Sequence, residues 1–358
     1  MWGGRRPAVH TGMLLAAGLA LLLAASGCAE RSAPPPPQPE ARVEAPPPAP
    51  PVAALRVAYA STGLSQAYVW LAQEAGYFAE EGLAVELQYV PGSNVANQAL
   101  LAQEIQFLAG AGTTSIGAAL GGADTVILAT MTGTFVINIM ATPDVEPTPE
   151  SVRGRTVAVT RIGSTSDFVA RYWLRHLGLE PVTDVPIVQV GGNAEMVAAL
   201  ASGAAQIVSV TDLFGLELQR QGYRLLADMG ALGVEYVYSG VGSTRSYVAA
   251  HEDIVRRYLR AAIRGQARFV ADPAFSVPVV SRYTQIDDTE VLRRAWERHT
   301  TQYLKRIPYT TPAAVRTALE ELALTNERAR TADPEQFYDN RFVRELEEAG
   351  FFAALYPS

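Results

Sequence analysis

Six short clusters of Gly, Ser, Thr, Asn and Asp are the part of this sequence best suited to bind a small molecule. Each cluster follows a predicted strand and precedes a predicted helix. The clusters are Ser61-Thr62-Gly63, Gly92-Ser93-Asn94, Gly112-Thr113-Thr114-Ser115, Gly163-Ser164-Thr165-Ser166, Gly191-Gly192-Asn193 and Thr211-Asp212. Hydroxyl and amide groups bind solute oxygens, and the free N–H groups of a helix N-terminus favour negative charge. The clusters therefore favour capture of a small anionic or polar solute without covalent chemistry.

The same residue types also begin helices that bind nothing, because Ser, Thr, Asn and Asp are preferred N-cap residues. Singly, each cluster is interpreted as a cap; together on one sheet edge, two or three are expected to contact ligand. The strongest candidate is the 163–166 cluster, with three consecutive hydroxyls. The ligand-binding candidates are Ser61, Thr62, Ser65, Tyr68, Ser93, Asn94, Thr113, Thr114, Gly163, Ser164, Thr165, Ser166, Asn193 and Asp212.

Arrangements typical of catalysis are scarce. The four histidines lie at 10, 176, 251 and 299 with no metal-binding spacing between them. The sequence contains neither a GxSxG nucleophile elbow nor a GxxxxGK[ST] phosphate loop. No catalytic residue, metal or cofactor is expected. Tyr59, Tyr68, Trp70 and Phe135 could form an aromatic wall beside an organic ligand, although aromatic residues at such spacings are more often part of a core.

The N-terminus has the layout of a bacterial export signal. Arg5 and Arg6 precede an apolar run over 13–25, which ends in small residues and in Cys28, the only cysteine. The segment Ala25-Ser26-Gly27-Cys28 resembles the lipobox of bacterial lipoproteins, apart from alanine where leucine is usual. We expect a signal peptide over residues 1–27 and lipidation of Cys28. Residues 28–54, rich in Pro and Ala, are expected to form an extended linker.

The elements that must position the clusters follow an α/β pattern. Strand-like runs lie at 55–59, 84–90, 105–109, 125–129, 156–160, 186–190, 206–210 and 224–229. Helical periodicity lies between them, at 66–78, 95–102, 166–177 and 194–202, and helices dominate after 251. The length predicts two lobes. We assign residues 55–142 and 242–358 to lobe one and residues 143–241 to lobe two, with crossings near 135–149 and 236–248.

Charge argues against nucleic-acid binding. The chain has 29 basic and 36 acidic residues, a formal net charge of −7. A nucleic-acid-binding protein needs a basic surface to neutralise phosphates. We therefore expect no nucleic-acid partner.

Four stretches, in this order and spacing, resemble a known family. They are SQAYVWLAQEAGYFAEEGLAVELQYV (65–90), ALLAQEIQFLAGAG (99–112), VRGRTVAVTRIGSTSDFVARYWLRHLGL (152–179) and NAEMVAALASGAAQ (193–206). The sequence is similar over about 55–324 to the nitrate/sulfonate/taurine (NitT/TauT-type) solute-binding proteins of ABC importers, which include binders of a thiamine pyrimidine precursor. One departure is 67–70, where many relatives have a proline and a smaller apolar residue.

The resemblance implies a two-lobed type II periplasmic-binding-protein fold with ligand between the lobes and a C-terminal helical region. It also implies an ABC permease partner, a monomer and a location at the bacterial cell envelope. Two alternatives stay open. One is a ligand-sensing lipoprotein of the same fold, and the other is an enzyme of the related pyrimidine-precursor synthase branch. That branch uses a cysteine-rich iron motif, which a chain with a single cysteine at the export junction lacks.

Overall fold

A computed structural model describes residues 52–356. The expected signal peptide, Cys28 and nearly all of the expected linker lie outside this range, as do the last two residues. Within the described range, no helix combines the length and the apolar character needed to cross a bilayer.

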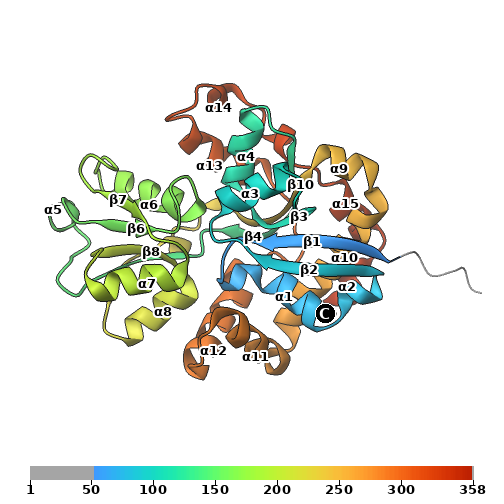
Figure 1. The fold of residues 1–358 in the computed structure, drawn as a ribbon, viewed down its shortest axis with the longest axis horizontal. Coiled ribbons are helices and arrows are strands. Elements are labelled where there is room, and N and C mark those ends of the chain that lie inside the picture. Colours follow the sequence, from blue (N-terminus) through green and yellow to red (C-terminus); the bar gives the residue numbers. More distant parts are fainter. Residues whose placement is uncertain (1–51, 357–358) are drawn as a thin grey trace, which may run out of the picture. The chain divides into compact units, whose positions relative to one another are not determined.

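The first of two five-stranded sheets has the strand order β2-β1-β3-β10-β4 (Figure 1). β1 runs parallel to β2 and β3, whereas β10 is antiparallel to β3 and β4. Every residue of β3 is buried, as expected for an inner strand covered on both faces. The strands are β1 (Ala53–Tyr59), β2 (Leu83–Tyr89), β3 (Phe107–Ala111), β4 (Thr125–Thr134) and β10 (Glu235–Thr244).

The helices associated with the first sheet are α1 (Ala67–Glu74), α2 (Tyr77–Glu80), α3 (Ser93–Leu101), α4 (Thr113–Leu120), α9 (Arg245–Ala250) and α10 (Glu252–Ala271). α1 packs closely on the long helix α10. A Cβ atom at Gly265 of α10 would collide with the carbonyl of Tyr68 in α1, so glycine permits this approach. We call this sheet with its helices the first lobe.

The second sheet has the order β7-β6-β8-β5-β9. β6 is parallel to β7 and β8, and β5 is antiparallel to β8 and β9. Its strands are β5 (Ile137–Ala141), β6 (Val157–Val159), β7 (Ile187–Gln189), β8 (Ile207–Thr211) and β9 (Arg224–Asp228). Its helices are α5 (Pro149–Val152), α6 (Thr165–His176), α7 (Asn193–Ser202) and α8 (Asp212–Arg220). We call this sheet with its helices the second lobe.

The C-terminal region is helical, as predicted. It comprises α11 (Pro273–Thr284), α12 (Thr289–Arg298), a π-helical turn (His299–Tyr303), α13 (Pro312–Leu322), α14 (Arg328–Thr331), α15 (Arg341–Glu348) and α16 (Phe351–Leu355). α11 packs on α1, and α13 on β10 and α4, so these helices belong to the first lobe. α12 also packs on α8, which gives it contacts with the second lobe.

The predicted α/β class is confirmed, and two strands were not predicted as such. β5 and β10 lie next to the two crossings between the sheets. The sequence indicated that the first crossing, 135–149, is rich in β structure, but it gave no strand bounds there, and it indicated only a connection at 236–248. β5 pairs with β8 and β9, so the chain enters the second sheet by Ile137, before the sequence-based boundary at 142. β10 contains Gly240, whose Cβ position lies 2.7 Å from the Ala129 carbonyl oxygen and 3.0 Å from that of Ala111. The neighbouring strands β3 and β4 approach so closely that only glycine fits at this position. Because glycine is uncommon inside strands, it made β10 hard to predict from the sequence.

Candidate functional site

A cavity lies where the carboxyl ends of strands from both sheets meet. Its volume is about 50 Å³. A single water needs roughly 10–15 Å³ by the same kind of measure, so the cavity accommodates a small polar group rather than a large molecule. The lining residues are Ala60, Ser61, Ser65, Gln66, Gly92, Ser93, Gly110, Ile137, Thr160, Ser164, Thr165, Ser166, Asn193, Met196, Ser209, Thr211 and Tyr238.

The lining is rich in hydrogen-bonding groups and contains no charged side chain. Three of its polar atoms are buried and have no hydrogen-bond partner within the described range: Gln66 Oε1, Ser209 Oγ and Thr211 Oγ1. Buried polar atoms in folded proteins are nearly always hydrogen-bonded, so unpaired atoms around one cavity point to a ligand.

Helices that begin at the cavity lack side-chain caps. The side chain of Ser164, the N-cap of α6, makes no capping hydrogen bond to a backbone N–H of the helix. Its hydroxyl instead contacts Thr160 Oγ1 at 2.8 Å and Ser166 Oγ at 3.0 Å. Thr211, the N-cap of α8, also leaves its helix uncapped. An anion near these N-termini would meet the positive ends of helix dipoles.

Hydrogen bonds between the lobes close the rim of the cavity. Thr165 N donates to Ser93 Oγ at 3.2 Å. Asn193 Nδ2 lies 3.4 Å from Ser61 Oγ and 3.3 Å from Thr62 Oγ1, and it can donate to both. Because each bond joins residues of different lobes, the structure is a closed arrangement.

The structure brings half of the sequence-predicted ligand residues to this cavity. They are Ser61, Ser65, Ser93, Ser164, Thr165, Ser166 and Asn193. Asn94, Thr113, Thr114 and Gly163 instead line a neighbouring groove, which Ser164 also reaches. Thr62 lies at the rim as a partner of Asn193.

Two candidates lie in other surroundings. Tyr68 is buried in the first lobe, where its hydroxyl donates to the Gly240 carbonyl at 3.5 Å. The carboxylate of Asp212 accepts from Asn138 Nδ2 at 3.2 Å and pairs with Arg298 at 3.1 Å. Asp212 is thus bound by Arg298 of α12 at the contact between α12 and the second lobe.

The proposed aromatic wall does not line the cavity. Tyr59 and Trp70 pack edge to face at 5.7 Å, and Trp70 stacks on Tyr283 at 4.9 Å. Phe135 packs against Tyr236 at 4.5 Å. These residues form aromatic clusters of their own.

Sequence reasoning missed several residues of the lining. Thr211 belongs to a cluster that the sequence identified, but Asp212 was chosen from it. Thr160 is the last residue of the predicted strand 156–160. Its place at the carboxyl end of that strand could have marked it as a lining residue. Ser209 and Tyr238 lie within strands, where the direction of a side chain depends on register.

Burial raises the pKa of Asp212 to about 6 from its ordinary value of 3.8, and the nearby Asp228 carboxylate acts in the same direction. Arg298, Asn138 and Arg294 lower this pKa, but they do not offset burial. The Asp212 side chain is only 5% exposed. This carboxyl therefore holds its proton more strongly in the folded chain than in the unfolded chain.

The pH dependence of stability should reflect this carboxyl. Because the folded-state pKa is raised, its stabilising contribution is complete below about pH 4 and is lost as the pH rises through about 6. The difference corresponds to about 3 kcal/mol, at about 1.36 kcal/mol per pKa unit. We expect the unfolding free energy of Asp212→Asn, relative to the unaltered protein, to rise by up to that amount between pH 4 and pH 7. Urea denaturation at several pH values measures it; a pH-independent difference would contradict the assignment.

Among residues 52–356, no group of three or more His, Cys, Asp or Glu side chains is arranged to hold a metal ion. The buried His299 faces Phe269 and Tyr303, and burial lowers its pKa to about 3.

Two sheets joined by two crossings, with polar strand ends around a cavity between the lobes, define a protein of the periplasmic-binding-protein class of folds. The family model described as NMT1/THI5 like matches residues 65–275. The chain belongs to this family. The resemblance inferred from the sequence is confirmed at the level of family and fold.

A curated relative is YtlA of Bacillus subtilis strain 168, named as a putative binding protein. It is 25% identical over 255 residues, covering 70% of this chain and 76% of YtlA.

Several solved structures share the fold. A protein from Bordetella bronchiseptica RB50 has a TM-score of 0.75 at 21% identity, covering 83% of this chain and 98% of its own. The alkanesulfonate-binding protein SsuA from Xanthomonas axonopodis pv. citri, bound to MOPS, has a TM-score of 0.68 at 18% identity and covers 82% and 100%. The nitrate-binding protein NrtA from Synechocystis PCC 6803 has a TM-score of 0.67 at 18% identity and covers 87% and 92%.

The same fold also occurs in an enzyme. The desulfurization enzyme DSZB has a TM-score of 0.58 at 17% identity, with coverage of 82% of this chain and 99% of that enzyme. Fold alone therefore does not separate binding from catalysis, and the site must decide.

Proposed function

We propose that this protein is an extracytoplasmic solute-binding lipoprotein that captures a small anionic or polar organic solute and delivers it to an ABC importer. The observation that carries the proposal is the uncharged, hydrogen-bonding cavity between two lobes. Its partners would be the solute, the permease of the importer and the membrane, through a lipid on Cys28.

The closed rim supports capture rather than an open catalytic pocket. Thr165 and Asn193 of the second lobe hydrogen-bond to Ser93, Ser61 and Thr62 of the first. Opening these bonds would widen access to the cavity, and it calls for a hinge motion of one lobe against the other. Opening and closing around a solute is the working cycle of a carrier protein.

The lining indicates the chemistry of the solute. With no charged side chain, the cavity would bind an anionic group through hydroxyls and helix N–H groups, or a neutral group through the same donors. Structural relatives named for binding nitrate and alkanesulfonate agree with an oxyanion-bearing solute.

Two other functions are possible on this fold. A sensor lipoprotein would use the same closure to signal to a membrane partner, and transport by the permease reconstituted in proteoliposomes distinguishes the two. An enzyme would need reactive groups at the cavity. The lining contains no acid, histidine, lysine or cysteine, so the site favours binding.

Thermal-shift screening tests the proposal. The purified protein would be screened against nitrate, alkanesulfonates, taurine, aromatic carboxylates and pyrimidines. A ligand that binds only the folded state stabilises it by about 2.7 kcal/mol at 100 times its Kd. We expect one solute class to raise the melting temperature without being converted to a product. Turnover of a bound solute would instead identify an enzyme.

The membrane attachment makes a separate prediction. In the producing bacterium, Cys28→Ser should abolish lipid modification, because the thiol that would carry the lipid is absent. The folded protein and its ligand binding should be unchanged. Detergent phase partitioning measures the change: the unaltered protein is expected in the detergent phase and the variant in the aqueous phase. Recovery of the unaltered protein from the aqueous phase would refute the anchor.

A further inference from the structure

Arg298, the last residue of α12, joins the first lobe to two acidic residues of the second. Its Nη1 lies 3.1 Å from Asp212 Oδ1, and its Nη2 lies 2.6 Å from Asp228 Oδ2. Asp212 is the first residue of α8, and Asp228 is the last residue of β9. One guanidinium group therefore bridges two carboxylates of the opposite lobe, each through a different nitrogen.

The π-helical turn after α12 fixes the direction of this guanidinium group. The turn spans His299–Tyr303 and follows directly on Arg298. It brings Tyr303 beside Arg298, whose Nη2 donates to the Tyr303 hydroxyl at 2.6 Å. π-helical turns are rare and occur frequently at functional sites. Here the turn supplies a second residue that holds the guanidinium group against the two carboxylates.

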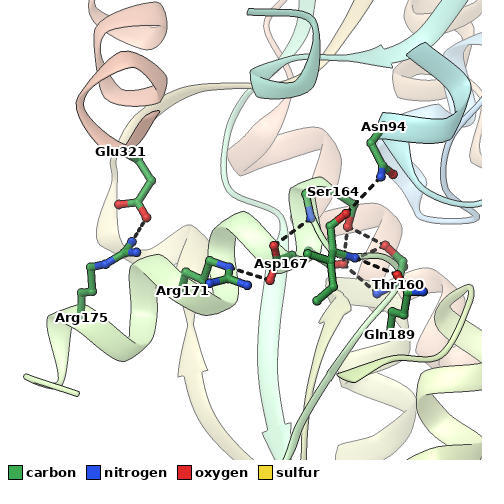
Figure 2. A network of polar contacts seen from close by, with 11 residues as sticks. Asn94, Thr160, Ser164, Asp167, Arg171, Arg175, Gln189 and Glu321 are labelled. Carbon is green, nitrogen blue, oxygen red and sulfur yellow. Dashed lines mark hydrogen bonds and ion pairs between the residues drawn. The ribbon is translucent and has the colours of Figure 1, made fainter. Parts of the chain in front are cut away.

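Other ion pairs between the lobes are closer to water. Arg220, at the end of α8, pairs with Asp288, the N-cap of α12, and Arg175 of α6 pairs with Glu321 of α13 (Figure 2). These four side chains are between 13% and 54% exposed, whereas the Asp212 side chain is 5% exposed. Among the charged groups of these pairs, the Asp212 carboxylate loses the most water in the closed arrangement.

Asp228 lies beside the crossings between the lobes. Its Oδ1 accepts from Gly230 N at 3.0 Å. A Cβ atom at Gly230 would lie 2.8 Å from Tyr303 Cε1 and 2.9 Å from the carbonyl oxygen of Phe135, in the first crossing. Hinge motions change a few residues at such connections and leave the packed elements intact. We therefore expect Asp228 to stay near Arg298 when the lobes separate.

Asp212 lies on the part of the second lobe that has to move. It follows Thr211, which lines the cavity. A Cβ atom at Gly63 of the first lobe would lie 2.8 Å from Thr211 Cγ2, so these two residues touch across the lobes. Opening of the cavity separates Gly63 from Thr211. Because Asp212 is the next residue of the chain, it moves with Thr211, away from Arg298 and into water.

Closure therefore buries a carboxylate, and Arg298 makes that burial tolerable. Burial is the largest influence on the pKa of Asp212 and raises it, and Asp228 acts in the same direction. Arg298 is the largest influence that lowers this pKa, followed by Asn138 and Arg294. A buried charge without a partner is strongly unfavourable. Without Arg298, the closed arrangement would hold such a charge at neutral pH.

We propose that Arg298 is a positioning residue for solute capture, which neutralises Asp212 as the second lobe closes and so determines what fraction of the protein is closed. Arg298 is not among the residues that line the cavity, so it acts on the conformation of the protein and not by contact with the solute. The inference rests on the proposed function, because closure matters to a protein that captures a solute between its lobes.

Disulfide cross-linking across the rim measures closure without any solute. Ser93 Oγ and Thr165 Oγ1 lie 3.2 Å apart on opposite lobes. Ser93→Cys and Thr165→Cys would be introduced into the full chain together with Cys28→Ser, so that they form the only thiol pair. The rate of disulfide formation under a fixed oxidant at neutral pH then reports the closed fraction. We expect Arg298→Met and Arg298→Gln each to slow cross-linking tenfold or more.

Rescue by a neutral residue separates closure from stability. Adding Asp212→Asn to either Arg298 variant removes the charge that closure would bury, so cross-linking should return to within threefold of the rate with both residues unaltered. A residue with only a structural role would lower the melting temperature and leave the cross-linking rate of the folded protein unchanged. Should Arg298→Met fail to fold, Arg298→Gln, which keeps a hydrogen-bond donor, gives the decision.

Arg293→Met is the matched control, because Arg293 pairs with Glu290 and Glu297 of its own helix; its cross-linking rate should be unchanged. An unchanged rate in the Arg298 variants, or no rescue by Asp212→Asn, would overturn the proposal. Because cross-linking uses no solute, its result is independent of the thermal-shift screen, and failure of the proposed function is recognisable separately.

Discussion

Replacing Ser164 and Thr165 together by alanine is expected to weaken solute binding by about a hundredfold or more. Both side chains line the cavity at the N-terminus of α6. A hydrogen bond to a charged group contributes about 1.5–3 kcal/mol. Two such bonds to an oxyanion amount to about 3–6 kcal/mol, and each 1.4 kcal/mol is about tenfold in affinity. Calorimetric titration with the solute found by screening measures the loss.

The same double variant also tests whether the cluster is only a helix cap. A capping serine or threonine contributes about 0.5–2 kcal/mol to stability. Ser164 makes no capping bond, so we expect the change in affinity to exceed the change in stability. Ser202→Ala with Thr317→Ala is a matched control, because among residues 52–356 these helical hydroxyls bond only to carbonyls of their own helices. Unchanged affinity with a lower melting temperature would reject the binding role.

Replacing Arg298 by methionine should destabilise the fold by about 3 kcal/mol or more, since removing one partner of a buried ion pair leaves an uncompensated charge. Arg298 contacts Asp212 at 3.1 Å and Asp228 at 2.6 Å, and Asp212 is buried. The destabilisation should be larger at pH 7 than at pH 4, where Asp212 is protonated. Denaturant unfolding at both pH values measures it.

A double variant isolates the charge from the packing. With Asp212→Asn added, the uncharged amide no longer needs Arg298, and part of the lost stability should return at pH 7. Arg293→Met serves as the control, because Arg293 is half exposed and pairs with Glu290 and Glu297 of α12. Equal destabilisation by Arg293→Met and Arg298→Met would show that the buried ion pair is not the cause.

Much of the fold could be predicted from local patterns. The predicted strands at 55–59, 84–90 and 206–210 correspond to β1, β2 and β8, because buried strands are short apolar runs bounded by turn residues. Helices with regular periodicity, such as α6 and α7, were found within a residue or two of their ends. β10 was not predicted, because its glycines are typical of a loop in sequence, although the close approach of the neighbouring strands requires them.

The sequence by itself determined the residue types at the strand ends, and with them the hydrogen-bonding character of the site. These residue types follow from local structure, because a turn from strand to helix favours Gly, Ser, Thr and Asn. Which of them share one cavity was decided by the tertiary structure. Asp212 and Thr211 are neighbours in sequence, yet Thr211 lines the cavity whereas Asp212 binds Arg298, which is 86 positions further along the chain. Spacing along a chain does not specify which elements pack together or which way a side chain points, and both depend on packing between distant segments.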